Sequence, residues 1–225
     1  MVWLIDVIPN NDAGIALVLV TLIVSVLLYS VSKKAIKTQL AMKEIEPELK
    51  KIRTEVTNKE EQARQTLALY KKNKVNPFSM ILLIAIQFPI LIALYYVFYQ
   101  GFPEIHTDVL YSFVKVPETV NMMFLGIVDL GQKNIVLAVL AGVTQYIQAA
   151  ILASYNKPKP LAEGEKRTMQ EEFANSMHVQ MKYFLPVVIG AISLGLPSAL
   201  PLYWSIRNLF TAAQEVFVRR QTKKV

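Results

Sequence analysis

The chain has 225 residues, 53% of them apolar, and a formal net charge of +7. Its mean hydropathy of +0.35 and several nearly uncharged runs of about 20 residues exclude an ordinary soluble domain, because such runs match a bilayer core of about 30 Å. The chain contains no cysteine, so a disulfide framework, thiol chemistry and a lipoprotein anchor are not expected.

Most basic residues fall in three blocks, at 33–74, 157–182 and 219–224. Lys and Arg accumulate in the cytoplasmic loops of membrane proteins, so we predict that all three blocks lie on the cytoplasmic side. This topological bias accounts for the net positive charge, and direct nucleic-acid recognition is not expected.

The alternation of apolar runs and polar blocks predicts an all-α polytopic membrane protein with five transmembrane helices, an outer N-terminus and a cytoplasmic C-terminus. The predicted elements, in chain order, are an outer N-terminal segment (1–12), a first span (13–32), a cytoplasmic helical hairpin (33–76), a second span (77–100), an outer loop with an interfacial segment (101–133), a third span (134–155), a cytoplasmic loop (156–182), a fourth span (183–196), an outer turn (197–201), a fifth span (202–218) and a basic cytoplasmic tail (219–225).

The last apolar region, 183–218, is predicted to cross the membrane twice. As a single helix it would be about 54 Å long at 1.5 Å per residue, far longer than the bilayer core. Basic residues flank it on both sides, so both ends belong to the same side and the number of spans is even. Pro197 and Pro201 flank the predicted turn.

The segment 33–76 has apolar residues at helical spacing on two arms, with a break near Thr57 and Asn58. Pro47 is predicted to bend the first arm or to begin a new helix. A solvated helix pair is the plain interpretation. The alternative is a surface that contacts lipid head groups, the ribosome or a targeting component, through the basic residues Lys43, Lys50, Lys51 and Arg53.

Polar side chains also occur inside the predicted spans: Thr21, Ser25, Gln87, Gln145, Gln148, Arg207 and Asn208. Hydrogen bonding between helices explains the neutral ones equally well. Arg207 is different, because a charge deep in a span costs at least about 2.5–3.5 kcal/mol on insertion scales. We predict that Arg207 lines a wetted cavity. The alternatives are snorkelling and a structural pair with Glu215, but Glu215 lies eight residues away, about 12 Å along the axis, which is too far for a direct contact.

Trp204 precedes Arg207 by three residues and shares its helix face, although Trp204 and Tyr203 also fit the role of interfacial anchors. His106 and His178 are the only histidines and fall in different loops, so no metal site is expected. No catalytic constellation and no phosphate-binding loop occur, so we expect neither an enzyme nor a bound cofactor.

Several motifs, taken in order, resemble those of the YidC/Oxa1/Alb3 membrane protein insertases. They are MKEIEPELKKI at 42–52, YKKNKVNP at 70–77, QFPI at 87–90, LAGVTQ at 140–145, MKYFLP at 181–186, and the residues around Leu202 to Thr211. Each motif is modest alone, but the ordered set is specific and covers residues from about 13 to 220.

The resemblance implies a chaperone and insertase of the bacterial plasma membrane that uses no nucleotide hydrolysis. Its five spans would enclose a hydrophilic groove, open to the cytoplasm and to lipid and closed on the outer side. The implied partners are newly made membrane proteins and lipid, together with the ribosome, targeting factors and the secretion translocon. The implied groove residues are Arg207, Ser25, Thr21, Gln145, Gln148, Trp204 and Gln87.

One position departs from the family pattern. The family places its groove arginine in the first span, at the position of Ser25, whereas this chain has its arginine in the fifth span at Arg207. We hypothesise that the positive charge has moved from the first span to the fifth. Arg207 would lie about one turn, roughly 6 Å, nearer the outside, a difference that its long side chain partly recovers.

Two other classes compete with the insertase. A small channel or solute carrier would need a pore through both leaflets, and the lack of a carboxylate near the middle of any span and of inverted repeats argues against it. A scaffold that only assembles other membrane proteins would tolerate the loss of Arg207.

Overall fold

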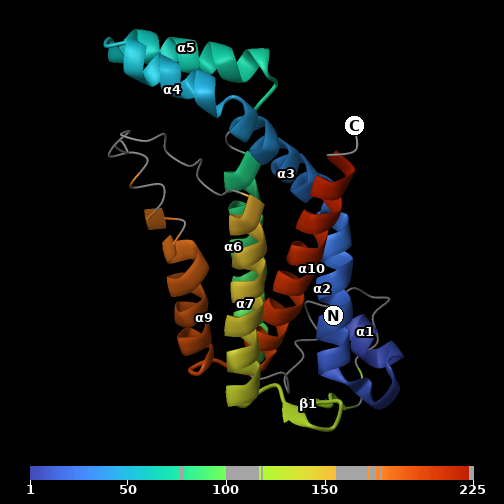
Figure 1. Cartoon of the computed structure of the whole chain (residues 1–225). Coiled ribbons are helices and arrows are strands. Elements are labelled where there is room, and N and C mark those ends of the chain that lie inside the picture. The colour runs from blue at the N-terminus through green and yellow to red at the C-terminus, as the bar shows by residue number, and fades with distance from the viewer. Residues whose placement is uncertain are drawn as a thin grey trace. The chain divides into compact units, whose positions relative to one another are not determined.

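The computed structural model describes residues 1–76, 79–99, 117, 119–155, 172, 176–177 and 179–222. Over these residues the chain is almost entirely helical, which confirms the all-α prediction (Figure 1). The predictions for His106, His178 and the basic residues at 223–224 fall outside the described residues.

The chain forms two compact units. Unit 1 consists of Met1–Leu27 and Ile90–Ala213, and unit 2 consists of Leu28–Pro89 and Gln214–Val225. Within unit 1 lie α1 (Val2–Val7), the 3-10 helix η1 (Pro9–Asn11), α2 (Ala13–Leu27), β1 (Met123–Phe124), β2 (Val128–Asp129), α7 (Ile135–Tyr155), the π-helix η3 (Gln180–Phe184) and α9 (Leu185–Ser193). Within unit 2 lie α3 (Tyr29–Glu44), α4 (Glu46–Glu55) and α5 (Lys59–Lys72), while α6 (Ser79–Tyr99) and α10 (Ala199–Thr222) contribute residues to both units.

Side-chain caps fix where two helices of unit 1 begin. Asp12 Oδ1 accepts hydrogen bonds from the backbone N–H groups of Gly14 (2.7 Å) and Ile15 (3.0 Å) at the start of α2. Asn134 Oδ1 accepts one from the N–H of Leu137 (3.1 Å) at the start of α7. Such caps satisfy N–H groups that the first helical turn leaves without partners.

Two glycines let α7 and α9 pack closely. A Cβ atom placed on Gly142 would lie 3.1 Å from the carbonyl oxygen of Pro186 and 3.5 Å from the Cα of Gly190. Small residues allow helix backbones to approach each other, and this type of contact is typical of helices packed within a membrane.

A short antiparallel ribbon, β1 paired with β2, is the exception to the helical pattern. Its turn contains Leu125 and Gly126, whose φ angles of 51° and 70° are both positive. This is the region predicted from sequence to be an interfacial segment, with no conformation assigned. A two-residue pair carries too little periodicity to be recognised in a sequence.

Unit 2 contains a helical hairpin formed by α4 and α5. Pro47 lies in the first turn of α4, so of the two predicted alternatives, a bend in the first arm or a new helix, the structure shows the new helix. Asn58 caps α5 by accepting hydrogen bonds from the N–H groups of Glu60 and Glu61. The two helices enclose a small apolar core made of Ile45, Leu49, Leu69 and Val75.

The helix α10 is longer than the predicted fifth span at both ends. It begins at Ala199, so Pro201 lies in its first turn rather than in the preceding turn. Proline is tolerated there because the first N–H groups of a helix have no partner within it. At the other end α10 continues to Thr222 and includes Arg219, which was predicted to belong to the tail.

Among the described residues, one helix, Ile135–Tyr155, is long and apolar enough to cross a membrane. A second would be added if Ala13–Leu27 and Tyr29–Glu44 were counted as one broken span, and Ala85–Phe98 is a shorter apolar stretch. The five-span arrangement therefore stays a prediction.

Candidate functional site

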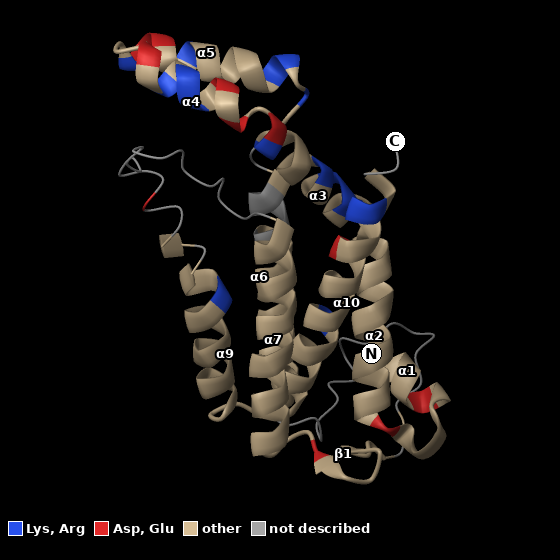
Figure 2. Cartoon of the chain, in the orientation of Figure 1, with Lys and Arg blue, Asp and Glu red and all other residues tan. Residues whose placement is uncertain are grey.

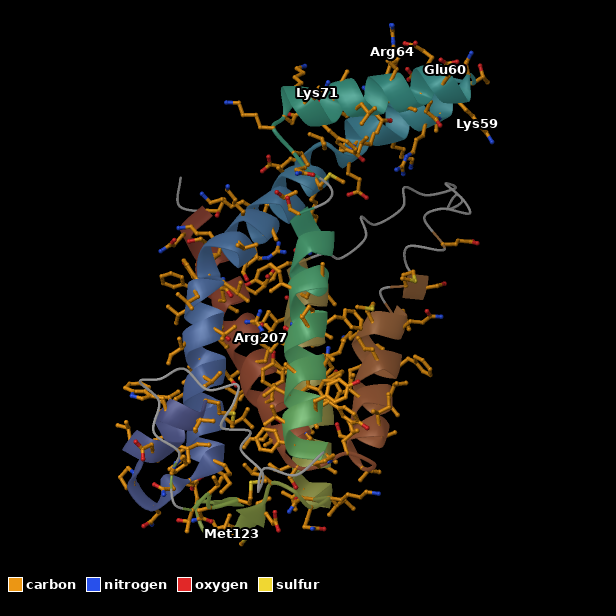
Figure 3. The ribbon with its side chains drawn as sticks, turned by 180° about the vertical axis from the view of Figure 1, so that it is seen from behind. Lys59, Glu60, Arg64, Lys71, Met123 and Arg207 are labelled. Carbon is orange, nitrogen blue, oxygen red and sulfur yellow. The ribbon has the colours of Figure 1, made fainter. Side chains whose placement is uncertain are left out.

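The guanidinium group of Arg207 on α10 reaches across to α2. Its Nη1 donates a hydrogen bond to Ser25 Oγ at 3.2 Å, although the two residues are 182 positions apart in the chain. Figure 3 shows the side chain of Arg207 beside α2. A hydroxyl carries no charge, so this bond positions the guanidinium without cancelling its positive charge.

The hydroxyl groups of Ser25 and Thr21, one turn apart on α2, each donate a hydrogen bond to the backbone of the same helix. Ser25 Oγ donates to the carbonyl oxygen of Thr21 at 2.6 Å, and Thr21 Oγ1 donates to that of Leu17, also at 2.6 Å. Because the hydroxyl proton of Ser25 is directed to the backbone, its lone pairs are turned towards the arginine. Thr21 and Ser25 are both buried.

A second polar contact joins α10 to α7. Asn208 Nδ2 donates to Thr144 Oγ1 at 3.4 Å, and both side chains are buried. Consecutive residues of a helix point about 100° apart. Arg207 and Asn208 can therefore contact two different helices, and α2, α7 and α10 are linked by polar side chains at one level of α10.

Thr144 and Ser205 belong to this polar interior but were not singled out in the sequence. Both are buried, and both donate their hydroxyl protons to a backbone carbonyl one turn earlier in their own helices. A signal existed for Thr144, because it precedes Gln145 and lies four residues before Gln148, on the helix face of the two predicted glutamines.

The remaining predicted groove residues lie on three helices. Gln145 and Gln148 are half-buried on α7, three residues apart and on the face that also carries the buried Ala141. Trp204 is half-buried and packs against the apolar core of unit 1. Gln87 is half-buried on α6 and belongs to unit 2. Within the predicted set, hydrogen bonds join Arg207 to Ser25 and Ser25 to Thr21.

Unit 2 contains a buried charged group at the end of α10. Arg219 is 2% exposed, and its Nε donates to Glu215 Oε1 while its Nη2 donates to Gln39 Oε1 at 2.9 Å. Glu215 therefore pairs with Arg219, as their spacing allows, because residues four apart on a helix face each other.

The basic residues of the hairpin have different surroundings. Lys50, Lys51 and Arg53 are exposed on α4, whereas Lys43 is half-buried on α3. Figure 2 shows Lys and Arg along α3, α4 and α5, interspersed with Asp and Glu on the hairpin helices. Over the described residues, no group of three or more His, Cys, Asp or Glu side chains could hold a metal ion.

Comparisons with known proteins match nearly the whole chain. The model of the 60Kd inner membrane protein family matches residues 3–225. A membrane protein insertase YidC from Clostridium tetani is 32% identical over 219 residues, which cover 96% of this chain and 86% of the relative. The YidC of Oceanobacillus iheyensis is 30% identical over 226 residues, covering 97% and 80%. The membrane protein insertase MisCA of Bacillus subtilis is 25% identical over 217 residues, covering 93% and 71%.

Proposed function

The chain belongs to the YidC/Oxa1/Alb3 family of membrane protein insertases, and from this premise we propose that it inserts client membrane proteins, and helps them fold, through a hydrophilic groove centred on Arg207 and Ser25. The observation that carries the proposal is the 3.2 Å contact between Arg207 Nη1 and Ser25 Oγ. This contact supports the proposal, because it brings the guanidinium of the fifth predicted span next to Ser25, the residue that the resemblance aligns with the family's arginine in the first span.

The proposed topology has five spans in the bacterial plasma membrane, with the N-terminus outside. The charge distribution supports this orientation, because Lys and Arg gather on α3, α4 and α5 and at the end of α10 (Figure 2). Within unit 1, Leu125 and Ile127 in the ribbon turn are 60% and 77% exposed. Exposed apolar side chains on a short ribbon suit an interfacial position on the outer side.

The proposed mechanism begins with attraction between Arg207 and an acidic segment of the client. A carboxylate at the centre of a bilayer costs about 2.5–3.5 kcal/mol on insertion scales. A cationic group in a wetted groove offsets this cost, because it provides an opposite charge in a region of reduced dielectric. Ser25 holds the guanidinium in place, and its neutral hydroxyl leaves the positive charge available to the client.

The client's own apolar helix supplies the driving force. Each Leu, Ile, Val or Phe at the centre of a span contributes about 0.3–0.6 kcal/mol, so a span of about 20 such residues contributes roughly 6–12 kcal/mol. This exceeds the cost of moving one or two carboxylates through a groove. Insertion by this route therefore needs no nucleotide hydrolysis.

The hairpin formed by α4 and α5 is the proposed contact for cytoplasmic partners. The exposed cations Lys50, Lys51 and Arg53, with Lys43 on α3, would meet anionic surfaces such as those of the ribosome or lipid head groups. Targeting factors and the secretion translocon are further proposed partners.

The test is insertion of a small single-span client with an acidic tail into proteoliposomes that contain the purified protein. We compare the wild type, Arg207→Ala, and Arg207→Ala combined with Ser25→Arg. Arg220→Ala is the matched control, because Arg220 is an exposed arginine on the same helix. The expected result is insertion by the wild type and the control, loss in Arg207→Ala, and recovery in the double variant.

Each other outcome is informative. Full insertion by Arg207→Ala would show that the arginine is structural, as a scaffold would allow, and would overturn the charge-attraction step. Loss in Arg207→Ala without recovery in the double variant would overturn the equivalence of the two positions. A wild type that performs no better than empty liposomes would contradict insertion by this chain alone.

A further inference from the structure

Asp12 is the centre of a hydrogen-bonded cluster at the start of α2. Asp12 is 4% exposed, and each of its two carboxylate oxygens accepts hydrogen bonds from a different element. Oδ1 caps α2 by accepting from Gly14 and Ile15, whereas Oδ2 accepts the N–H of Leu125 from the ribbon turn at 2.8 Å. One buried carboxylate therefore ties the ribbon to the helix that carries Ser25.

The backbone reinforces this connection at both neighbouring helix starts. The N–H of Ala13 donates to the carbonyl oxygen of Asn121 at 2.9 Å. The N–H of Ser198 donates to the carbonyl oxygen of Gln132 at 2.8 Å, and Ser198 directly precedes the first residue of α10. In Figure 1 the ribbon lies at the end of unit 1 where α2, α7 and α10 begin.

The turn of the ribbon is strained and depends on its surroundings. Leu125 has a φ of 51°, in the left-handed region that is unfavourable for a residue with a Cβ. Such conformations persist when neighbouring contacts determine them. Asp12 supplies such a contact, because its Oδ2 accepts the N–H of this same leucine.

The ribbon region packs against an apolar core of unit 1, which we call the apolar plug and whose members are all buried. They are Ile5, Ile8, Ala13, Ala16, Leu17, Phe98, Leu130, Leu137, Ala199, Leu202 and Tyr203. Met122, Phe124 and Val128 of the ribbon region pack against it. The polar contact at Ser25 lies 13 residues beyond Asp12 along α2, or about 20 Å of helix.

We propose that Asp12 is a positioning residue that locks the ribbon over the apolar plug and thereby keeps the outer end of the protein impermeable to protons and small ions. The proposal rests on the proposed function in one respect, because a wetted groove around Arg207 makes a dry seal at the other end necessary. An open ribbon would admit water to the plug, and continuous water through the unit would conduct protons.

The variants separate the contact between Asp12 and Leu125 from the role of Asp12 as the N-cap of α2. Asp12→Ser keeps a good N-cap for α2, but the shorter side chain cannot also reach Leu125. Gly14→Ala displaces the ribbon without changing Asp12, because the added Cβ would lie 2.3 Å from Phe124 Cδ2. Asp129→Ser is the control. Its carboxylate lies on the same ribbon and accepts from Gly131 N–H at 2.8 Å.

Two readouts use the same purified full-length variants. Hydrogen exchange at the Leu125 amide reports whether the ribbon is released. The decay of an imposed pH gradient in proteoliposomes loaded with a pH-sensitive dye reports permeability, and client insertion is measured in parallel. We expect Asp12→Ser and Gly14→Ala to show faster exchange and a several-fold faster gradient decay, while the wild type and Asp129→Ser match empty liposomes.

The proposal is overturned if exchange at Leu125 accelerates and the gradient does not, because the ribbon would then be open without a leak. It is also overturned if exchange is unchanged in Asp12→Ser, or if Asp129→Ser leaks equally. Failure of the proposed function gives a different result, since a wild type that inserts no client can still show the Asp12-dependent leak. A variant that inserts normally yet leaks identifies a seal rather than general loss of structure.

Discussion

Arg207 Nη1 and Ser25 Oγ lie 3.2 Å apart, and this hydrogen bond joins α10 to α2 within unit 1. It brings the arginine of this chain next to Ser25, the position that we hypothesise corresponds to the family's arginine. A guanidinium on either helix can therefore reach the same region, because the side chain of arginine is long and flexible. The relocated-charge hypothesis depends on this contact.

The charge of the client should decide how much Arg207 matters. We expect Arg207→Gln to lower insertion of an acidic-tailed client by about tenfold, equivalent to about 1.4 kcal/mol, because one attractive charge is lost. A client of the same length with a neutral tail should change little, and Arg207→Lys should retain part of the activity. Initial insertion rates for the paired clients measure this. An equal loss for both clients would indicate a structural role.

The buried pair of Arg219 and Glu215 should be sensitive to loss of one partner. We expect Arg219→Met to lower the free energy of unfolding by about 3–5 kcal/mol, because it leaves a buried carboxylate without its cation. The double variant Glu215→Leu with Arg219→Met should recover most of this. Thermal unfolding in detergent, followed by circular dichroism, measures both.

An exposed pair provides the control for this prediction. Arg64 and Glu61 form a salt bridge on α5 with side chains 81% and 39% exposed. We expect Arg64→Met to change the free energy of unfolding by at most about 1 kcal/mol, because water screens such pairs. Similar losses for Arg64→Met and Arg219→Met would contradict the assigned importance of burial.

Close packing of α7 on α9 should not tolerate a large residue at Gly142. A Cβ there already lies 3.1 Å from the carbonyl oxygen of Pro186, so Gly142→Leu should destabilise the protein by about 1–3 kcal/mol. Gly190→Ala is the mild comparison on the facing helix, because its Cβ would meet its nearest atoms at an ordinary 3.7 Å. The melting temperatures of the two variants in detergent test the difference, and a stable Gly142→Leu protein would disprove the packing argument.

The hairpin core should depend on Leu49 and not on Leu67. Leu49 is buried between α4 and α5, so Leu49→Ala should cost the hairpin about 2–5 kcal/mol. Leu67 is 59% exposed on α5, and Leu67→Ala should leave stability nearly unchanged. Hydrogen exchange of the α4 and α5 amides in the full chain measures local stability. Equal exchange in the two variants would contradict the core assignment.

The sequence by itself determined the helical class, the family and several helix starts. Hydrophobic periodicity and proline geometry are local properties, so a bend or a new helix at Pro47 could be predicted from a few neighbouring residues. The unusual arginine at 207 was also visible in the sequence, because a charge inside an apolar run is conspicuous. The ordered motifs identified the family that the comparisons confirm.

Only the tertiary structure decided which polar side chains meet. The partners Arg207 and Ser25, and likewise Asn208 and Thr144, come from segments far apart in the chain, and a sequence pattern does not specify the rotation of one helix against another. The attachment of Asp12 to Leu125 was equally hidden, because it depends on a ribbon too short to leave a periodic signal. Helix identity follows from local residue preferences, whereas these contacts follow from packing, in which each side chain's position depends on elements distant in sequence.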